Sequence, residues 1–321
     1  MGKHIIAKEN EMKSGWEHSH SGVFTLDLDK TVHYYQSLGL APELPNLPRN
    51  PSFLTGKAVN FEFGRVTQPG EVPRLQLIYI GNLELEVLQA PAERPTGEAL
   101  AYAEGINHVC FNVPDIDAET AKLVKKGLRI IQDFKMDGVR MEDYLDTRLF
   151  GNILLSLRAP QTAEAKTRKA GYGIVNWRFH GHDAVVRDAD ETARFYESLG
   201  IAEIQSQVIF DSSAIEDANA SGRFLKNGIK VKTRRFRIGP VAYELIQPLE
   251  GESIYKESLD RRGEGIIDLV FTVDDLERET AKLVEKGVPV IFSEKPRNGG
   301  AFVYFDTRKD GGDAMIKLVQ R

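Results

Sequence analysis

One helical segment occurs twice in this chain. ETAKLVKKG, which starts at Glu119, returns as ETAKLVEKG at Glu279, with eight of nine residues identical and a spacing of 160 residues. DYLDTR returns as VYFDTR at the same spacing, and the segments 27–40 and 188–201 match at a spacing of 161. A period that recurs at separate places marks a duplicated structural unit. The two halves of the chain are therefore predicted to share one fold.

Each half is itself a weaker repeat of two modules. The turn residues Asp27 and Asp115 lie 88 residues apart, and Asp188 and Asp275 lie 87 residues apart. Each Asp follows a short apolar run and can cap a helix by accepting from its first N–H groups. Apolar residues at steps of three and four then predict a helix with one buried face, and three strand-like runs follow it. The order β-α-β-β-β is thus predicted four times.

Chain length and linker composition divide the sequence into domains. The 321 residues are too many for one ordinary core and suit two domains of about 150 residues each. The stretch from Arg158 to Gly173 is poor in large apolar residues, which is typical of a linker. We expect an N-terminal tail at 1–17, a first domain at 18–160, a linker at 161–172 and a second domain at 173–321.

Composition excludes several classes of partner. With 41% hydrophobic and 28% charged residues and a net charge of −5, the sequence has no basic field for nucleic acid. Cys110 is the only cysteine, which excludes an intrachain disulfide and a thiolate zinc site and favours a reducing compartment. No apolar run is long enough for a membrane span or a signal peptide. We expect a cytoplasmic protein without nucleic-acid or membrane partners.

The four modules resemble those of a known superfamily. The first strand reads H-x-G-x-x-x-x-D, a helix closes on FYESLG, and a fourth strand reads ELIQP. With their recurrence in register over about residues 18 to 320, these motifs resemble the vicinal oxygen chelate superfamily. It includes glyoxalase I, methylmalonyl-CoA epimerase, extradiol ring-cleaving dioxygenases and fosfomycin-resistance enzymes. The resemblance implies an α+β fold in which four βαβββ modules form two tandem half-barrel domains.

The resemblance also implies a metal site in the first half. In the family a divalent ion binds a His seven residues before the turn Asp and a Glu on the fourth strand of each module. The matching positions here are His20, Glu86, His108 and Ser156. Two imidazoles and one carboxylate suit Fe, Mn, Co, Ni or Zn as the divalent ion. Ser156 stands where the family usually carries Glu, and it either binds the metal through water or makes room for a bulkier substrate.

The second half departs from this pattern. Its matching positions are Gly181, Glu244, Asp268 and Lys317. Two flanking histidines, His180 and His182, are expected to point to the opposite face unless a bulge shifts the strand. Because an ammonium group repels a cation, we expect Lys317 to replace the metal and to pair with Glu244 and Asp268. The second domain is therefore predicted to be metal-free.

Three protein ligands leave open positions for a small substrate with vicinal oxygens. The resemblance implies that the metal stabilises an enolate or oxyanion, as in a glyoxalase-like isomerase, epimerase or lyase. Such chemistry needs a base near an acidic C–H and a partner for the developing charge. The candidate catalytic residues are Glu84, Glu142, Tyr144 and Arg148. Arg148 belongs to the repeated Asp-Thr-Arg turn and Tyr144 lies just before it, so an architectural role stays open for both.

Two alternatives belong to other classes of function. An extradiol-type ring-cleaving dioxygenase has the same four modules, but it carries its working metal in the second half, where this chain has Lys317. A metal-free protein that binds and sequesters a small molecule needs no ligand histidines. The chain is expected to be a monomer or a homodimer. Trp16, Trp177 and the Pro-rich segment 44–56 are candidate pocket walls.

Overall fold

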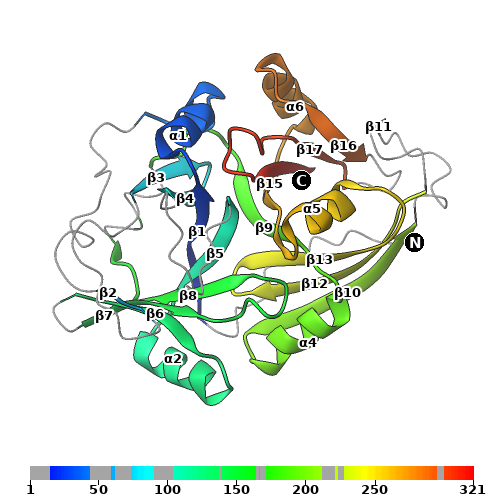
Figure 1. Cartoon of the computed structure of the whole chain (residues 1–321). Helices are drawn as coiled ribbons and strands as arrows, with labels where there is room; N and C mark the ends of the chain where they lie inside the picture. Colours follow the sequence, from blue (N-terminus) through cyan, green and yellow to red (C-terminus); the bar gives the residue numbers. More distant parts are fainter. Residues whose placement is uncertain are drawn as a thin grey trace.

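The structure, a computed structural model, describes residues 15–43, 59–61, 74–89, 104–136, 139–163, 166, 171–211, 221–222, 228–294 and 300–321. Most of the predicted tail and the whole segment 44–56 lie outside these residues. The four module helices lie at the periphery, and the strands β1 (Glu17–Thr25), β5 (Gly105–Asn112) and β9 (Arg178–Val185) lie toward the middle (Figure 1). No described helix has the length and apolar character needed to cross a membrane.

The first half forms one mixed sheet. Its elements are β1 (Glu17–Thr25), α1 (Leu28–Ser37), β2 (Val59–Phe61), β3 (Leu75–Ile80), β4 (Leu83–Gln89), β5 (Gly105–Asn112), α2 (Ile116–Lys125), β6 (Ile130–Met136), β7 (Val139–Leu145) and β8 (Leu154–Arg158). The described strands follow the order β2-β6-β7-β8-β5-β1-β4-β3. β1 and β5, the first strands of the two modules, pair antiparallel, and each pairs in parallel with its own fourth strand, β4 or β8.

The second half repeats this arrangement. Its elements are β9 (Arg178–Val185), α4 (Ala189–Ser198), β10 (Ala202–Asp211), β11 (Ser221–Gly222), β12 (Lys230–Ile238), β13 (Val241–Glu250), α5 (Ile254–Arg262), β14 (Gly265–Ile266), β15 (Asp268–Val273), α6 (Leu276–Glu285), β16 (Val290–Glu294), β17 (Phe302–Phe305) and β18 (Met315–Gln320). Their order is β10-β12-β13-β9-β15-β18-β17-β16-β11, with β14 beside β9. β9 and β15 take the places of β1 and β5.

The predicted helix caps are confirmed. In α1, α2, α4 and α6 the residue before the helix is the turn Asp of its module, in extended conformation, and its side chain accepts from backbone N–H groups of the first turn. These caps satisfy donors that the first helical turn leaves unpaired. The same local signal therefore begins all four module helices.

The two halves pack through their first strands. One hydrophobic core cluster contains buried residues of both halves, among them Phe111 and Phe271. The His18 ring stacks on Phe179 with a centroid separation of 4.9 Å. His182 Nδ1 donates to the carbonyl oxygen of Asp268 at 2.8 Å, so its Nε2 accepts from the Ser21 hydroxyl at 2.9 Å. The halves thus share one interior.

The repeated Asp-Thr-Arg turns hold the halves together reciprocally. The Tyr35 hydroxyl of α1 donates to the carbonyl of Gly311, and the Tyr196 hydroxyl of α4 donates to the carbonyls of Phe150 and Ile153. Each turn of one half therefore contacts the first helix of the other half. The turn is repeated because each copy contributes to packing between the two halves.

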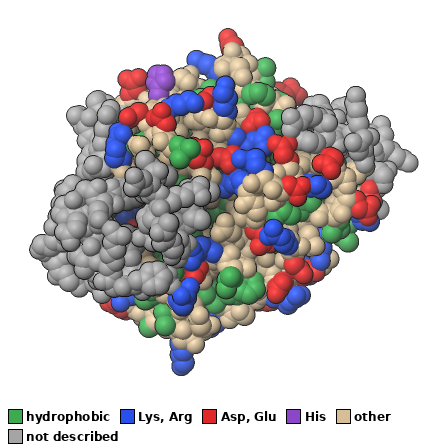
Figure 2. Space-filling view, viewed as in Figure 1, with side chains coloured by type: hydrophobic (Ala, Val, Ile, Leu, Met, Phe, Trp, Pro, Cys, Tyr) green, Lys and Arg blue, Asp and Glu red, His purple; other side chains and the backbone are tan. Residues whose placement is uncertain are grey.

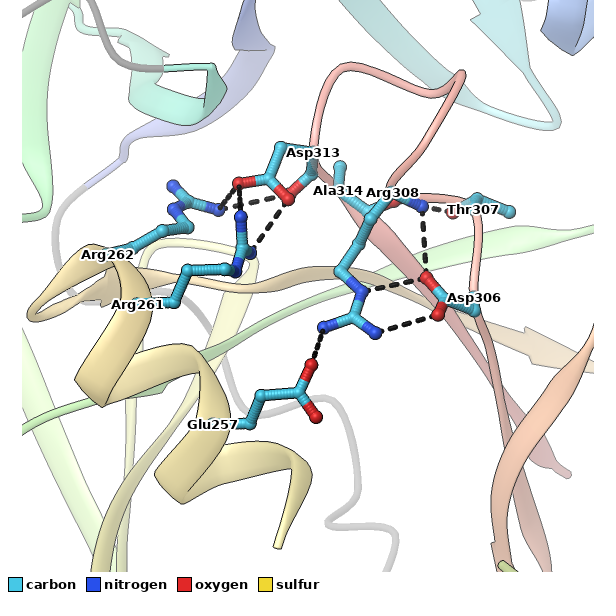
Figure 3. A network of polar contacts seen from close by, with 8 residues as sticks. All are labelled: Glu257, Arg261, Arg262, Asp306, Thr307, Arg308, Asp313 and Ala314. Carbon is cyan, nitrogen blue, oxygen red and sulfur yellow. Dashed lines mark hydrogen bonds and ion pairs between the residues drawn. The ribbon is translucent and has the colours of Figure 1, made fainter. Parts of the chain in front are cut away.

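Helix α5 holds the second of these turns in place. Arg261 and Arg262 both reach Asp313, while Glu257 of the same helix pairs with Arg308 (Figure 3). Arg262 also extends to the start of β5, where a Cβ on Gly105 would lie 2.1 Å from its Nη2 atom. Gly105 has a φ of +130°, a conformation that favours glycine, whereas the Arg262 guanidinium is the end of a flexible side chain and does not by itself exclude a Cβ.

The interface histidine predicts an acid-sensitive fold. Burial lowers the pKa of His182 from its ordinary value to about 4. Below pH 6.5 the unfolded chain takes up this proton before the folded chain does, so stability is lost as the pH falls from about 6.5 to about 4, by about 3 kcal/mol in total. We expect urea denaturation to show this slope in the wild type and a reduced slope in His182→Gln. The exposed His33 provides the control, and an unchanged slope in His182→Gln would refute the assignment.

Candidate metal centre

Two histidines meet on adjacent strands of the first domain. His20 on β1 lies opposite Cys110 of β5, and Gly22 lies opposite His108. The Nε2 atoms of His20 and His108 are 3.1 Å apart. A Cβ at position 22 would lie 2.0 Å from the His108 ring. The absence of a side chain at Gly22 therefore gives the His108 ring its place beside His20.

A carboxylate completes the cluster from β4. Gly22 lies opposite Glu86 on its other side, so the carboxylate reaches the same point. Glu86 Oε2 lies 3.5 Å from both His20 Nε2 and His108 Nε2. Both histidines are 1% exposed and Glu86 is 6% exposed, so water solvates these atoms little. His20, Glu86 and His108 form a group whose ligand atoms could hold one ion.

The other ring nitrogens have oxygen partners. His108 Nδ1 lies 2.8 Å from Asn107 Oδ1, which can only accept, so His108 carries its proton on Nδ1. His20 Nδ1 lies 3.2 Å from Ser19 Oγ. Such contacts orient metal-binding histidines and direct the Nε2 lone pair toward the ion. In His108 this lone pair faces a carboxylate and a second imidazole.

The spacing of the three atoms fits a divalent cation. Donors about 2.1 Å from one centre are about 3.0 Å apart in an octahedron and about 3.4 Å apart in a tetrahedron. The observed separations of 3.1 to 3.5 Å agree with this range. Buried electron pairs that face one another repel unless a cation lies between them. The donor set therefore suits the metal chemistry that the sequence predicted.

Glu142 and Ser156 lie beside the three. Ser156 Oγ donates to Glu142 Oε1 at 2.9 Å, and this Oε1 lies 3.9 Å from His20 Nε2. Arg158 Nη2 lies 3.1 Å from the other carboxylate oxygen. Sequence reasoning missed Arg158, although its place two residues after Ser156 on a strand puts it on the same face.

The remaining candidate catalytic residues lie at different places. Glu84 is buried two residues before Glu86 on the same face of β4, and it accepts from the Tyr79 hydroxyl at 3.0 Å. The Tyr144 hydroxyl lies 3.5 Å from His108 Nε2, and burial followed by Glu142 raises its pKa. Arg148 instead forms a two-bond pair with Asp146 in the turn, at 2.7 and 2.9 Å. Glu84 and Tyr144 belong to the site face, and Arg148 belongs to the turn.

The two tryptophans are not pocket walls. Trp16 is 1% exposed and packs on Phe111, and Trp177 is 3% exposed and packs on Phe271. Both rings therefore belong to the hydrophobic core, and the prediction that they line a pocket is wrong. Large aromatic residues are equally suited to cores and to ligand pockets, so their sequence position could not decide between the two.

In the second domain an ammonium group occupies the corresponding place. Lys317 Nζ lies 2.7 Å from Asp183 Oδ2 and 3.6 Å from Glu244 Oε2, which confirms the predicted pairing with Glu244. The predicted contact with Asp268 is replaced by one with Asp183, whose position corresponds to Gly22. Asp268 Oδ1 accepts instead from the Asp183 backbone N–H, and burial followed by Asp183 raises the pKa of Asp268. His182 faces the first domain.

Strand register allows a residue-by-residue comparison of the two halves. Tyr144 lies opposite Ser156, and Tyr304 lies opposite Lys317, so the tyrosines occupy one position. By the same register Glu142 and Arg158 correspond to Phe302 and Val319. From the β1–β4 and β9–β13 pairs, Glu84 corresponds to Ala242. The tyrosine is common to both halves, whereas these charged residues occur only in the first and are not needed for the fold.

Comparison with known proteins identifies the family. A family model described as the glyoxalase/bleomycin resistance protein/dioxygenase superfamily matches residues 19–141 and 183–305. These segments make up more than half of the chain, which therefore belongs to this superfamily. The resemblance to vicinal oxygen chelate proteins is confirmed, and the fold consists of two tandem domains of this type.

One of the matched solved structures shares the fold over nearly the whole chain. A mutant of 4-hydroxymandelate synthase from Streptomyces coelicolor matches with a TM-score of 0.62 and 15% identity, over 96% of this chain and 93% of that chain. Methylmalonyl-CoA epimerase from Mycobacterium tuberculosis matches with a TM-score of 0.35 and 18% identity, over 44% of this chain and 86% of that chain. No curated protein sequence matches. At 15% identity the first likeness concerns the fold alone.

Removal of the Lys317 ammonium is expected to destabilise the second domain. Lys317→Met leaves Asp183 and Glu244 without this partner, and breaking a buried pair in this way costs about 3–5 kcal/mol. Urea denaturation measures the loss. The double variant Asp183→Asn/Lys317→Met removes both charges and should recover much of it. A single variant with wild-type stability would contradict the pairing.

Proposed function

We propose that the first domain is a divalent-metal-dependent enzyme acting on a small substrate with vicinal oxygens. The reaction is an isomerisation, epimerisation or lyase step that passes through an enolate or oxyanion. One observation carries the proposal: the Nε2 atoms of His20 and His108 and Oε2 of Glu86 converge within 3.1 to 3.5 Å, at buried positions. The metal is Fe, Mn, Co, Ni or Zn, since this donor set does not discriminate among them.

The metal ligands and the residues beside them have different proposed roles. His20, Glu86 and His108 would hold the ion, which when bound acts as a Lewis acid on the substrate oxygens. Asn107 orients His108 through its Nδ1 atom. The raised pKa of Tyr144 keeps its hydroxyl protonated at neutral pH, so this hydroxyl can donate to a developing oxyanion.

Glu84 is proposed as the general base. It lies on the same face of β4 as Glu86, at a distance along the strand of about 7 Å, which leaves room for a substrate between base and ligand. The Tyr79 hydroxyl orients its carboxylate at 3.0 Å. Ala242 takes its place in the second half, so the fold does not require a carboxylate there.

The second candidate is an extradiol-type dioxygenase. Two histidines and one carboxylate with open positions also suit Fe(II) enzymes that react with oxygen. Oxygen consumption with catechols separates the two functions, because isomerisation and lyase chemistry consume none. In either case the partner is a small molecule, and the chain is a monomer or homodimer. A third candidate, a metal-free sequestering protein, is tested by the metal measurement below.

No nucleic-acid partner is proposed. Lys and Arg side chains are interspersed with Asp and Glu on the face shown in Figure 2, and the net charge is −5. Binding to a phosphate backbone instead requires a basic surface. The sole cysteine, Cys110, is buried as a free thiol whose pKa is raised by burial. We propose a cytoplasmic location, because a free thiol suits a reducing compartment.

Metal content is expected to depend on both histidines. Purified wild-type protein should carry about one divalent ion per chain, because His20, Glu86 and His108 converge on one point. His20→Ala and His108→Ala should each remove it, as measured by elemental analysis. His33→Ala changes an exposed helix residue and serves as the control. Metal content that is unaffected by either site variant would exclude this centre, whereas wild-type protein without a bound divalent ion would favour the sequestering protein.

Glu84→Gln should separate catalysis from metal binding. With the base neutralised, kcat is expected to fall about 10²–10⁴-fold, because proton transfer contributes about this much. Solvent deuterium exchange into a bound substrate, followed by NMR, provides the readout. Metal content should stay at the wild-type level. A variant that exchanges deuterium as fast as the wild type would remove Glu84 from the mechanism.

A further inference from the structure

Asn112 is a buried amide on the same face of β5 as the proposed metal ligand His108. Residues two and four apart on a strand point to one face of a sheet, so His108, Cys110 and Asn112 share this face. Asn112 is 3% exposed, and among the residues that the structure describes none hydrogen-bonds to its Oδ1 atom. Buried amides are almost always hydrogen-bonded, because an unpaired one costs free energy. The Asn112 amide is therefore suited to a partner from outside the chain.

Two charged residues form a polar row with Asn112 on this face. Asn112 lies opposite Arg158 of β8, which in turn lies opposite Glu142 of β7. Arg158 Nη2 lies 3.1 Å from Glu142 Oε2, and Glu142 Oε1 lies 3.9 Å from His20 Nε2. A single carboxylate group thus separates Arg158 from a histidine that would hold the ion. A substituent of a molecule bound to that ion can therefore extend along the polar row toward Asn112.

The second domain shows that the fold does not need the polar row. By strand register the three corresponding positions hold Thr272, Val319 and Phe302. The Thr272 hydroxyl has a partner within the chain, since it donates to the carbonyl of Arg178 at 3.4 Å. The polar row occurs only in the domain whose histidines converge, which indicates a role in the site.

We infer that Asn112 determines substrate specificity by binding a neutral polar group, a hydroxyl or an amide, that the substrate carries beyond its vicinal oxygens. This inference rests on the proposed function, because it presupposes a substrate bound to the ion. An amide side chain offers both a donor and an acceptor, and hydroxyl and amide groups can use both. A hydrocarbon group at the same place would leave the Asn112 amide unpaired.

Charge balance favours a neutral group over a carboxylate. The site face brings together three carboxylates and one guanidinium, those of Glu84, Glu86, Glu142 and Arg158. A divalent ion would balance the two remaining negative charges. A further carboxylate in this buried place would be uncompensated, which is unfavourable. Because Arg158 pairs with Glu142, its role in the polar row is to hold that carboxylate.

Three catechols test the inference on the full chain loaded with Zn²⁺, which does not oxidise them. Each can chelate the ion through its two adjacent oxygens, and they differ in one ring substituent. This substituent is a methyl group in 4-methylcatechol, a neutral amide in 3,4-dihydroxybenzamide and a carboxylate in 3,4-dihydroxybenzoate. Isothermal titration calorimetry measures the Kd of each catechol for the wild type and for Asn112→Leu.

The preference for the benzamide over 4-methylcatechol should be about tenfold greater in the wild type than in Asn112→Leu, which is the usual effect of one buried hydrogen bond. Comparing the two proteins cancels any effect of the substituent on the chelating oxygens. The Kd of 4-methylcatechol should be the same in both, whereas a general loss of structure would weaken all three catechols. Asn176→Leu replaces an exposed asparagine and should leave every Kd at its wild-type value.

An equal preference in the wild type and in Asn112→Leu would overturn the inference, while binding of 4-methylcatechol to both would leave the proposed function intact. If Asn112→Leu weakens the benzoate most, the bound group is a carboxylate and the inference is also wrong. A wild-type chain that retains no Zn²⁺, or that binds none of the three catechols, would overturn both proposals. If Asn112→Leu does not fold by circular dichroism, Asn112→Ala carries the same expectation.

Discussion

The candidate site depends on the antiparallel pairing of β1 and β5 around Gly22. This pairing sets His20 and His108 on neighbouring strands with their Nε2 atoms 3.1 Å apart. A side chain at position 22 would occupy the space of the His108 ring. The same glycine lies opposite Glu86, so one residue without a side chain permits three donors to converge. Backbone pairing thus brings together the electron-pair donors on which the proposed metal binding depends.

In the second domain the ammonium group of a lysine side chain neutralises the buried carboxylates at the corresponding place. Asp183 replaces the glycine, and Lys317 binds both it and Glu244. Its pKa is raised because these carboxylates outweigh the cost of burial, so it remains an ammonium group at any physiological pH. A divalent ion, as proposed for the first domain, and the lysine of the second domain are two ways to neutralise buried acids. The second domain then contributes packing, through its first strand and the reciprocal turns.

Much of the fold was predictable because its signals are local. The capping aspartates, the helical periodicity and the repeat each act over a few residues or recur at a constant spacing, so four modules follow from the sequence. The positions of His20, Glu86 and His108 follow from the motif. Arg148 could not be separated from the site by sequence, because its pairing with Asp146 depends on the path of the turn. The roles of Asp183 and Arg158 depend on strand register.

The amino-acid sequence alone determined the duplication, the order of elements within each module and the types of donor available to a metal. Tertiary structure decided which of these donors meet. Glu142 and Ser156 are 14 residues apart on different strands, yet they are joined at 2.9 Å because β7 turns back on β8. Asp183, not Asp268, pairs with Lys317 because the residue opposite Glu244 is set by register between β9 and β13. Side-chain convergence across strands depends on distances that local sequence patterns do not encode.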